Sequence, residues 1–319
     1  MKILTSLSLL SSALCGEPFL ATMGFFDGVH LGHQALLNEL REDALRKGMK
    51  SVILALDRPY AVAARPDLPH PKLLSSLSKK VSLLSEQPCD LLFLIPFTNE
   101  VAALDMEAFV RPLMEIGMKG MTLGYDNRFG RKEYALPLTD FDERLRNLGL
   151  DVRRIRQYRA DGIPVSSSEI RERVQGGDFE GARLLLGRPF SLIGEVESGR
   201  KIGRTIDYPT ANIVPIEPDI VLPRPGIFVS EVRVEDQVYP SMSYYGSSPT
   251  VAGWQGPLRI EAYLFGFHDN LYGKRAEIAF RHRIRGDRQF DSLKELKERL
   301  AQDEQFTKEY FRNHPLLLA

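Results

Sequence analysis

The stretch from Phe19 to His33, FLATMGFFDGVHLGH, decides the fold of the N-terminal half of the chain. Its apolar residues from Leu20 to Met23 predict a short buried strand, and glycines then break this strand where a helix must begin. His30 and His33 stand three residues apart, so we expect both imidazoles on one face of the first helical turn. Unpaired N–H groups and the positive end of the helix dipole lie at the same place. The stretch therefore predicts an anion site at the end of a strand.

Two glycines and two histidines suit this site to phosphate chemistry. Gly28 and Gly32 carry no side chain and would let a ligand approach the backbone closely. Two imidazoles beside free amides can stabilise the negative charge that develops during phosphoryl or nucleotidyl transfer. The alternative is that His30 and His33 only pack or cap, which is the commoner role of a single histidine. Their position between glycines, directly after a strand, favours the functional interpretation.

Length and composition limit the classes of protein that the chain can represent. Its 319 residues allow two domains with cores of their own. Its 42 basic and 42 acidic residues balance, so we expect neither a nucleic-acid nor a membrane partner. No obligatory protein partner is predicted either. Cys15 and Cys89 form neither a metal-ligand spacing nor a disulfide framework, which is typical of a reducing, cytoplasmic setting.

The N-terminal run from Lys2 to Gly16 imitates a short secretory signal. It is rich in serine, however, and Leu14 before Cys15 is a poor cleavage site. We interpret the run as part of the fold. No stretch approaches the ~18 consecutive apolar residues of a membrane span.

The rest of the N-terminal half alternates buried strands with amphipathic helices, which predicts a doubly wound parallel sheet. Ligands of such sheets bind beyond the carboxyl ends of the strands, where His30 and His33 fall. We expect further strands over 52–56, 91–95, 121–123 and 152–155, and helices from His33 to about Gly48 and over 78–86, 106–116 and 140–148.

The pattern changes after Gly187 to short strands separated by glycine and proline, which predicts an antiparallel β-barrel. A helical tail that contains Leu293, Leu296 and Leu300 is expected to pack against it. We expect the strands over 191–197, 227–234, 238–244, 260–265 and 276–282.

The run GFFDGVHLGH resembles the adenylylation motif of the bacterial bifunctional riboflavin kinase/FAD synthetases, and its H-x-G-H core resembles the HIGH-type nucleotidyltransferases. The resemblance covers nearly the whole chain. It implies a Rossmann-like FMN adenylyltransferase domain over 1–186 and a riboflavin kinase domain over 187–319. It also implies that His30 and His33 are catalytic, and that ATP phosphates are bound by the turn residues Gly24, Phe26, Asp27, Gly28 and Gly32.

Two later segments of the N-terminal half resemble the same family. GYDNRFG (124–130) is similar to G-x-D-F-x-F-G, which implies that Asp126, Asn127 and Phe129 bind flavin. Asn127 stands where an aromatic residue is usual, and an ordinary β-turn is the alternative interpretation. VSSSEIRERV (165–174) is similar to I-S-S-T-x-I-R, which implies contacts to the ATP phosphates from Ser166, Ser167, Ser168 and Arg171. Serine also caps helices, and both roles can hold together.

One segment departs from the family pattern in the N-terminal half. After the second strand the family has Pro-His-Pro, whereas this chain has Arg58-Pro59-Tyr60. The missing histidine bears on how well the chain adenylylates FMN, and Arg58 is the residue that could supply positive charge instead.

The barrel carries the second set of motifs. GRKIGRTIDYPTANI (199–213) resembles G-R-T-x-G-F-P-T-A-N, which implies ATP contacts from Gly203, Arg204 and Thr205. Thr210 and Asn212 place two neutral oxygens on one face of an extended segment, which suits Mg²⁺ bridged to ATP phosphates.

Glu261 lies in a strand whose alternate positions are apolar, so its charge either faces solvent or serves a function. The resemblance implies that it is the general base that takes a proton from the riboflavin 5′-hydroxyl. The loop 243–250 departs from the pattern, because Tyr244 replaces an Asn and Ser248 replaces an Arg.

We therefore expect a cytoplasmic bifunctional enzyme that phosphorylates riboflavin to FMN with Mg²⁺ and ATP, and then adenylylates FMN to FAD. Its substrates would be the small molecules riboflavin, FMN and ATP. Two alternatives stay open: only the kinase activity is retained, or the chain is a non-catalytic flavin-binding protein.

Overall fold

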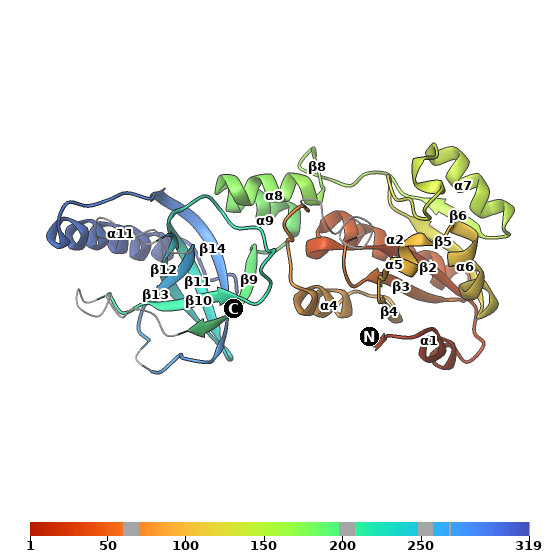
Figure 1. The fold of residues 1–319 in the computed structure, drawn as a ribbon, viewed down its shortest axis with the longest axis horizontal. Helices are drawn as coiled ribbons and strands as arrows, with labels where there is room; N and C mark the ends of the chain where they lie inside the picture. The colour runs from red at the N-terminus through yellow and green to blue at the C-terminus, as the bar shows by residue number, and fades with distance from the viewer. Residues whose placement is uncertain (60–69, 198–207, 248–257, 268, 319) are drawn as a thin grey trace. The chain divides into compact units, whose positions relative to one another are not determined.

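The computed structural model describes residues 1–59, 70–197, 208–247, 258–267 and 269–318, which belong to two compact units (Figure 1). The first unit contains Met1–Pro71 and Leu77–Ser166, and the second contains Lys72–Ser76 and Ser167–Ala319.

The first unit is built on a six-stranded parallel sheet with the strand order β1-β4-β3-β2-β5-β6, as the alternating pattern predicted. The strands are β1 (Lys2–Leu4), β2 (Phe19–Gly24), β3 (Lys50–Leu56), β4 (Leu91–Ile95), β5 (Met118–Leu123) and β6 (Asp151–Arg154). The helices are α1 (Leu7–Leu14), α2 (Leu31–Arg46), α4 (Leu77–Ser85), α5 (Asn99–Ala103), α6 (Met106–Glu115) and α7 (Leu138–Asn147), and a short hairpin of β7 (Arg159–Ala160) and β8 (Ile163–Pro164) follows.

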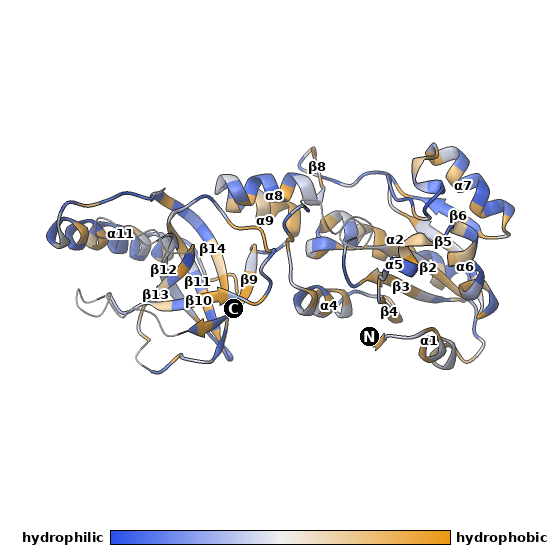
Figure 2. Ribbon diagram, in the orientation of Figure 1, coloured by the Kyte–Doolittle hydropathy of each residue, from blue (hydrophilic) through white to orange (hydrophobic). Residues whose placement is uncertain are grey.

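The central strands of this sheet are buried on both faces. Strands β2 and β3 are hydrophobic along nearly their whole length (Figure 2). Val52 and Leu54 of β3 join one hydrophobic cluster, whereas Ile53 and Ala55 join another. Because successive side chains of a strand point to opposite faces, the two clusters lie on the two sides of the sheet. The doubly wound arrangement is thereby confirmed.

The N-terminal run that imitates a signal is packed into this unit. Strand β1 pairs in parallel with β4, and Leu10 and Leu14 of α1 are fully buried in the core. Ser6 caps α1 by accepting a hydrogen bond from the Leu9 N–H.

The second unit contains a closed antiparallel barrel with the strand order β10-β13-β12-β11-β14-β9, which confirms the second architectural expectation. Its elements are α8 (Ser167–Gly176), α9 (Phe179–Leu186), β9 (Ser191–Glu197), β10 (Ala211–Pro215), β11 (Gly226–Val234), β12 (Gln237–Gly246), β13 (Arg259–Leu264), β14 (Arg275–Gly286) and α11 (Leu293–Asn313). The strand patterns did not predict β10, which is short and ends at a proline.

The two units divide at Ser166, which is earlier in the chain than the expected domain boundary between residues 186 and 187. Helix α9 explains the difference, because its Phe179 ring packs on the barrel residues Phe228 and Phe280, with ring centroids 5.8 and 5.5 Å apart. By their contacts, α8 and α9 therefore belong with the barrel.

Candidate functional site

The two histidines of the first unit lie at the start of α2, where the sequence placed them. His30 is the N-cap residue, and its Nδ1 accepts a hydrogen bond from the His33 N–H at 3.2 Å. The two rings stack with centroids 3.6 Å apart and planes 12° apart. His30 is buried. The packing and capping interpretation is thus part of its role, and the His33 amide, expected to be open to phosphate, already has a partner within the turn.

The turn before α2 is strained. Gly28 has a φ of 71°, in the left-handed region that glycine tolerates, and the non-glycine residues Phe26 and Val29 have φ values of 54° and 39°. Such values in side-chain-bearing residues are costly and cluster at functional sites. The turn is held in this shape by the surrounding packing.

The glycines that flank this turn make room for rings of the protein itself. A Cβ at Gly24 would lie 3.1 Å from the Phe26 ring, and one at Gly32 would lie 3.2 Å from the His30 ring. A side chain at either position would crowd these rings. Gly32 was expected to let a ligand approach the backbone; it also leaves room for the His30 ring, and its contact with a ligand stays a prediction.

Lys80 was not predicted from the sequence, yet it is buried beside the turn. Its Nζ donates to the Leu56 carbonyl at 2.7 Å and lies 3.7 Å from the centroid of the Phe25 ring. Burial lowers the pKa of Lys80 to about 8, against the opposing effect of the Asp27 and Asp57 carboxylates. This lysine joins the end of β3 to the turn.

A sequence signal for Lys80 did exist. It lies four residues before Leu84 in α4, and both side chains are buried. Residues four apart share a helix face, so Lys80 puts a charge on the apolar face of an amphipathic helix. A charge at such a position is seldom buried without a partner.

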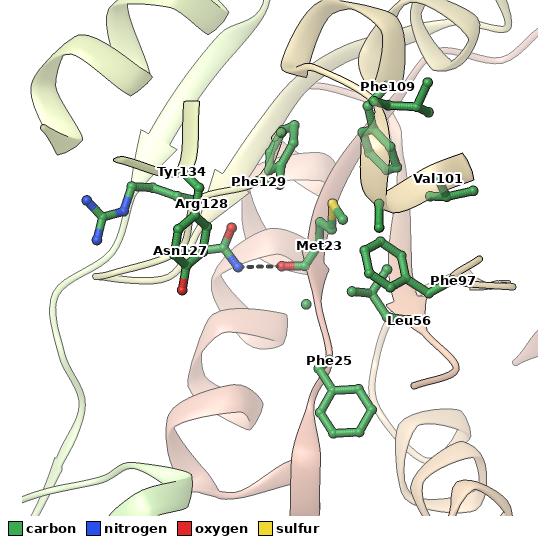
Figure 3. Close-up of a pocket in the computed structure, with 14 residues that line it drawn as sticks. Met23, Phe25, Leu56, Phe97, Val101, Phe109, Asn127, Arg128, Phe129 and Tyr134 are labelled. Atoms are coloured by element: carbon green, nitrogen blue, oxygen red, sulfur yellow. Dashed lines mark hydrogen bonds between the residues drawn. The ribbon is translucent and has the colours of Figure 1, made fainter. Parts of the chain in front are cut away.

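A cavity of about 170 Å³ opens beside the carboxyl ends of β2 and β3 (Figure 3). Most of its lining is aromatic or aliphatic, and its polar side chains are those of Asn127, Arg128 and Tyr134. The lining residues are Met23, Gly24, Phe25, Leu56, Phe97, Val101, Ala102, Leu104, Phe109, Asn127, Arg128, Phe129, Gly130 and Tyr134. Its place at the strand ends is where ligands of doubly wound sheets bind.

Two of the three predicted flavin-binding residues line this cavity. The Asn127 Nδ2 donates to the Met23 carbonyl at 2.7 Å (Figure 3), which ties the loop after β5 to the end of β2. Phe129 is buried, and its ring packs edge-on against Phe141 at 5.3 Å. Asp126 is exposed and does not line the cavity.

Arg154 of β6 holds the same loop and was also missed by the sequence analysis. Its Nε and Nη2 donate to the two carboxylate oxygens of Asp142 at 3.0 and 2.6 Å. Its Nη1 donates to the Asn127 carbonyl at 3.1 Å. The sequence did offer a signal for Arg154, because it lies within the expected strand 152–155. A charge in a buried strand requires partners.

The predicted phosphate-binding segment 166–171 is divided between the two units. Ser166 ends the first unit, whereas Ser167, Ser168 and Arg171 lie in α8 of the second. The Arg171 Nε donates to the Lys72 carbonyl at 2.6 Å, within the second unit. Contacts between this segment and the histidines therefore stay a prediction.

The departure at 58–60 is described only in part. The Arg58 guanidinium donates to both carboxylate oxygens of its neighbour Asp57, at 3.3 and 3.2 Å. Pro59 is described, and Tyr60 lies outside the described residues. The charge of Arg58 is thus shared with a carboxylate beside it.

In the barrel, the register of the strands brings three predicted residues together. Asn212 of β10 pairs directly with Glu261 of β13. Residues opposite each other in antiparallel strands present their side chains on one face, so the amide and the carboxylate are neighbours. The Thr210 hydroxyl donates to Glu261 Oε2 at 3.4 Å.

Tyr244 of β12 pairs with Glu261 from the other side. Its hydroxyl donates to Asp287 Oδ2 at 3.0 Å. Gly203, Arg204, Thr205 and Ser248, which the sequence singled out, lie outside the described residues.

No group of three or more His, Cys, Asp or Glu side chains in the described part of the chain could hold a metal ion by itself. The side-chain oxygens of Thr210 and Asn212 are of the kind that suits Mg²⁺, which takes a few protein oxygens together with phosphate oxygens and water. Among the residues described, no helix is both long and apolar enough to cross a membrane.

Comparison with known proteins assigns both halves of the chain. A riboflavin kinase family model matches residues 186–311, and a FAD synthetase family model matches residues 14–169. A bifunctional riboflavin kinase/FMN adenylyltransferase of Listeria monocytogenes is 31% identical over 290 residues, which cover 91% of each chain. The Escherichia coli protein of the same name is 32% identical over 318 residues, or 98% of each chain. The chain belongs to the bifunctional riboflavin kinase/FMN adenylyltransferase family.

The chain carries both domains of the two-step synthesis of flavin nucleotides, from riboflavin to FMN and from FMN to FAD. The FAD synthetase match contains the histidine pair and the cavity, and the riboflavin kinase match contains Glu261 and Asn212. A solved structure described as a macrolide-efflux protein from Streptococcus pneumoniae matches with a TM-score of 0.79 and 26% identity, and covers 92% of this chain and 94% of that one.

Proposed function

We propose that the barrel phosphorylates riboflavin with Glu261 as the general base. The observation that carries this proposal is the pairing of Glu261 with Asn212 in register, with the Thr210 hydroxyl 3.4 Å from the carboxylate. Glu261 is half-buried on a strand, so its position is fixed while its carboxylate is within reach of a ligand. A general base needs this combination of fixed position and hydrogen-bond reach.

In the kinase step, Glu261 accepts the proton of the riboflavin 5′-hydroxyl as that oxygen attacks the γ-phosphorus of ATP. The bond between the γ-phosphorus and the bridging oxygen breaks, and ADP leaves. Thr210 and Asn212 would hold Mg²⁺ together with the ATP phosphates. Gly203, Arg204 and Thr205 are proposed to contact ATP as well. Bound there, Mg²⁺ would neutralise the phosphate charge.

In the adenylylation step, the FMN phosphate attacks the α-phosphorus of ATP and pyrophosphate leaves, with no covalent enzyme intermediate. We assign His30 and His33 to hydrogen bonding and charge stabilisation in the transition state. The turn residues Gly24, Phe26, Asp27, Gly28 and Gly32 are proposed to contact the ATP phosphates beside them. Ser166, Ser167, Ser168 and Arg171 are proposed to contact the ATP phosphates at the start of α8.

We assign the cavity of the first unit to the flavin ring of FMN. Its aromatic and aliphatic lining suits a flat, largely apolar ring, and its position at the strand ends brings the ring near the start of α2. Asn127 and Phe129 contribute to the lining, and Asp126 of the same loop lies outside it.

Turnover with separated products tests these assignments. The chain is incubated with riboflavin, ATP and Mg²⁺, and riboflavin, FMN and FAD are resolved by chromatography. Both FMN and then FAD are expected. FMN that accumulates without FAD would mean that only the kinase is retained, and bound riboflavin without either product would identify a flavin-binding protein.

We also propose that this enzyme acts in the cytoplasm on small molecules, with no nucleic-acid, membrane or obligatory protein partner. Both cysteines are free, Cys15 exposed and Cys89 buried, as suits a reducing compartment. Burial raises the pKa of the Cys89 thiol to about 12, so this cysteine is not a reactive thiolate.

A further inference from the structure

Tyr208 precedes the Pro209–Asn212 segment that carries the proposed magnesium ligands. The family pattern has Phe at this position, so the chain differs by one hydroxyl group. Tyr208 is buried, and its hydroxyl donates to Glu304 Oε2 of α11 at 2.9 Å. The bond joins residues 96 positions apart in the sequence.

The ring of Tyr208 is fixed by packing that does not involve the hydroxyl. It lies edge-on against the Tyr263 ring, with centroids 5.2 Å apart and planes at 71°. Tyr263 lies two residues beyond Glu261 on β13, so it shares a strand face with the proposed base. A phenylalanine would keep these contacts, and the bond to Glu304 is therefore an addition to them.

Glu304 is itself held in place on α11. The Lys308 Nζ lies 2.6 Å from its other carboxylate oxygen, one helical turn further along. The preceding residue, Asp303, is buried and forms ion pairs with Arg285 of β14 and Arg299 of α11 at 2.8 and 3.3 Å. This turn of α11 is thus anchored to the barrel before it meets Tyr208.

The bond between Tyr208 and Glu304 is charge-assisted. The phenol hydroxyl donates to a carboxylate oxygen, and such bonds are stronger than those between two neutral groups.

We propose that Tyr208 is a positioning residue of the kinase site, which ties Pro209–Asn212 to α11 through Glu304 and so presets Thr210 and Asn212 for Mg-ATP. The inference rests on the proposed role of Thr210 and Asn212. Helix α11 is thereby a support of the kinase site as well as a cover of the barrel.

Substitution of the hydroxyl alone tests this proposal. We expect Tyr208→Phe to raise the KM for Mg-ATP in the kinase reaction by about three- to tenfold, because a hydrogen bond to a charged group is lost. The KM for riboflavin and the synthesis of FAD from supplied FMN should stay within about twofold of the unmodified chain. Tyr239→Phe is the matched control, since it removes a hydroxyl that bonds to Gln237 on the same strand.

A double variant tests whether Tyr208 and Glu304 act through the hydrogen bond between them or independently of each other. Glu304→Met should raise the KM for Mg-ATP about as much as Tyr208→Phe, and the two together should be no worse than either alone. Additive effects, or an unchanged KM with only a lower Tm, would overturn the proposal.

Amide hydrogen exchange over 209–215 measures, without turnover, how firmly the Tyr208–Glu304 hydrogen bond holds this segment. Faster exchange is expected in Tyr208→Phe and Glu304→Met than in Tyr239→Phe. If the unmodified chain makes no FMN but exchange responds, the proposed function fails and the tie stands. If FMN is made while neither the KM nor exchange responds, the tie is wrong.

Discussion

In the first unit the proposed catalytic histidines lie at the start of a helix, directly after a strained turn. In the barrel, by contrast, the proposed base lies within a hydrogen-bonded strand. His30 is placed by a helix cap, a ring stack and backbone with positive φ at Phe26 and Val29. Glu261 is placed by pairing with Asn212 on one side and Tyr244 on the other. A turn depends on its neighbours for its shape, while a strand within a closed barrel is fixed by its register.

This difference predicts how each site responds to change. The barrel should tolerate isosteric substitutions structurally and lose only chemistry, because the backbone bonds of its strands do not involve side chains. The turn should be sensitive also to a residue that supports it from outside, Lys80.

The largest effect is expected from Glu261→Gln. The amide has the same shape but cannot accept the hydroxyl proton, so the rate of FMN formation should fall by about 10²- to 10⁴-fold. FAD synthesis from supplied FMN should be unchanged, as measured by chromatography of both products. Glu195→Gln, an exposed position on β9, is the matched control. Equal loss of both activities would contradict the division of labour between the units.

The second effect concerns the turn. His30→Asn keeps a good N-cap residue but removes the imidazole, so it separates capping from catalysis. FAD synthesis should fall by about 10²-fold, as when one charge-stabilising donor is lost, with little change in Tm and none in kinase rate. A normal adenylylation rate would show that His30 only caps α2.

A smaller effect is expected from Lys80→Met, which removes the charge beside Asp27 and the bond to the Leu56 carbonyl. FAD synthesis should fall by about tenfold, because a hydrogen bond from a charged group that supports the turn is lost. Kinase activity serves as the control within the same molecule. Loss of both activities together would indicate general unfolding instead.

Lys80 also predicts a pH dependence of stability. Its pKa is lowered from 10.5 to about 8 in the folded chain, chiefly by burial, so between these values the unfolded chain binds more protons. The contribution of Lys80 to the free energy of unfolding should therefore increase as the pH rises from about 8 to 10.5. Urea unfolding of the unmodified chain and Lys80→Met across this range measures the difference, which should widen in favour of the unmodified chain. A constant difference would contradict the lowered pKa.

The smallest effect is expected from Asn127→Leu, which keeps the approximate size of the side chain and removes its bond to the Met23 carbonyl. The loop after β5 should loosen, and the KM for FMN in adenylylation should rise by about threefold. Asn147→Leu, an exposed residue at the end of α7, should leave it unchanged. If both variants behave alike, Asn127 does not shape the flavin cavity.

The sequence by itself determined the two architectures and most of the candidate residues. Near-continuous apolar runs such as 52–56 predict strands that are buried on both faces, and the shift to short strands predicts the barrel. Motifs of a few adjacent residues placed the histidine pair at the start of α2 and singled out Thr210, Asn212 and Glu261. These features are local, so neighbouring residues are enough to specify them.

The tertiary structure alone decided which distant groups support these sites. Lys80 meets the Leu56 carbonyl across 24 positions, Arg154 meets the Asn127 carbonyl across 27, and Tyr208 meets Glu304 across 96. The contacts of α9 with the barrel, which moved the division between the units, are of the same kind. Such contacts exist only after the chain has packed, because burial brings the partners together and also makes a buried charge or hydroxyl require one.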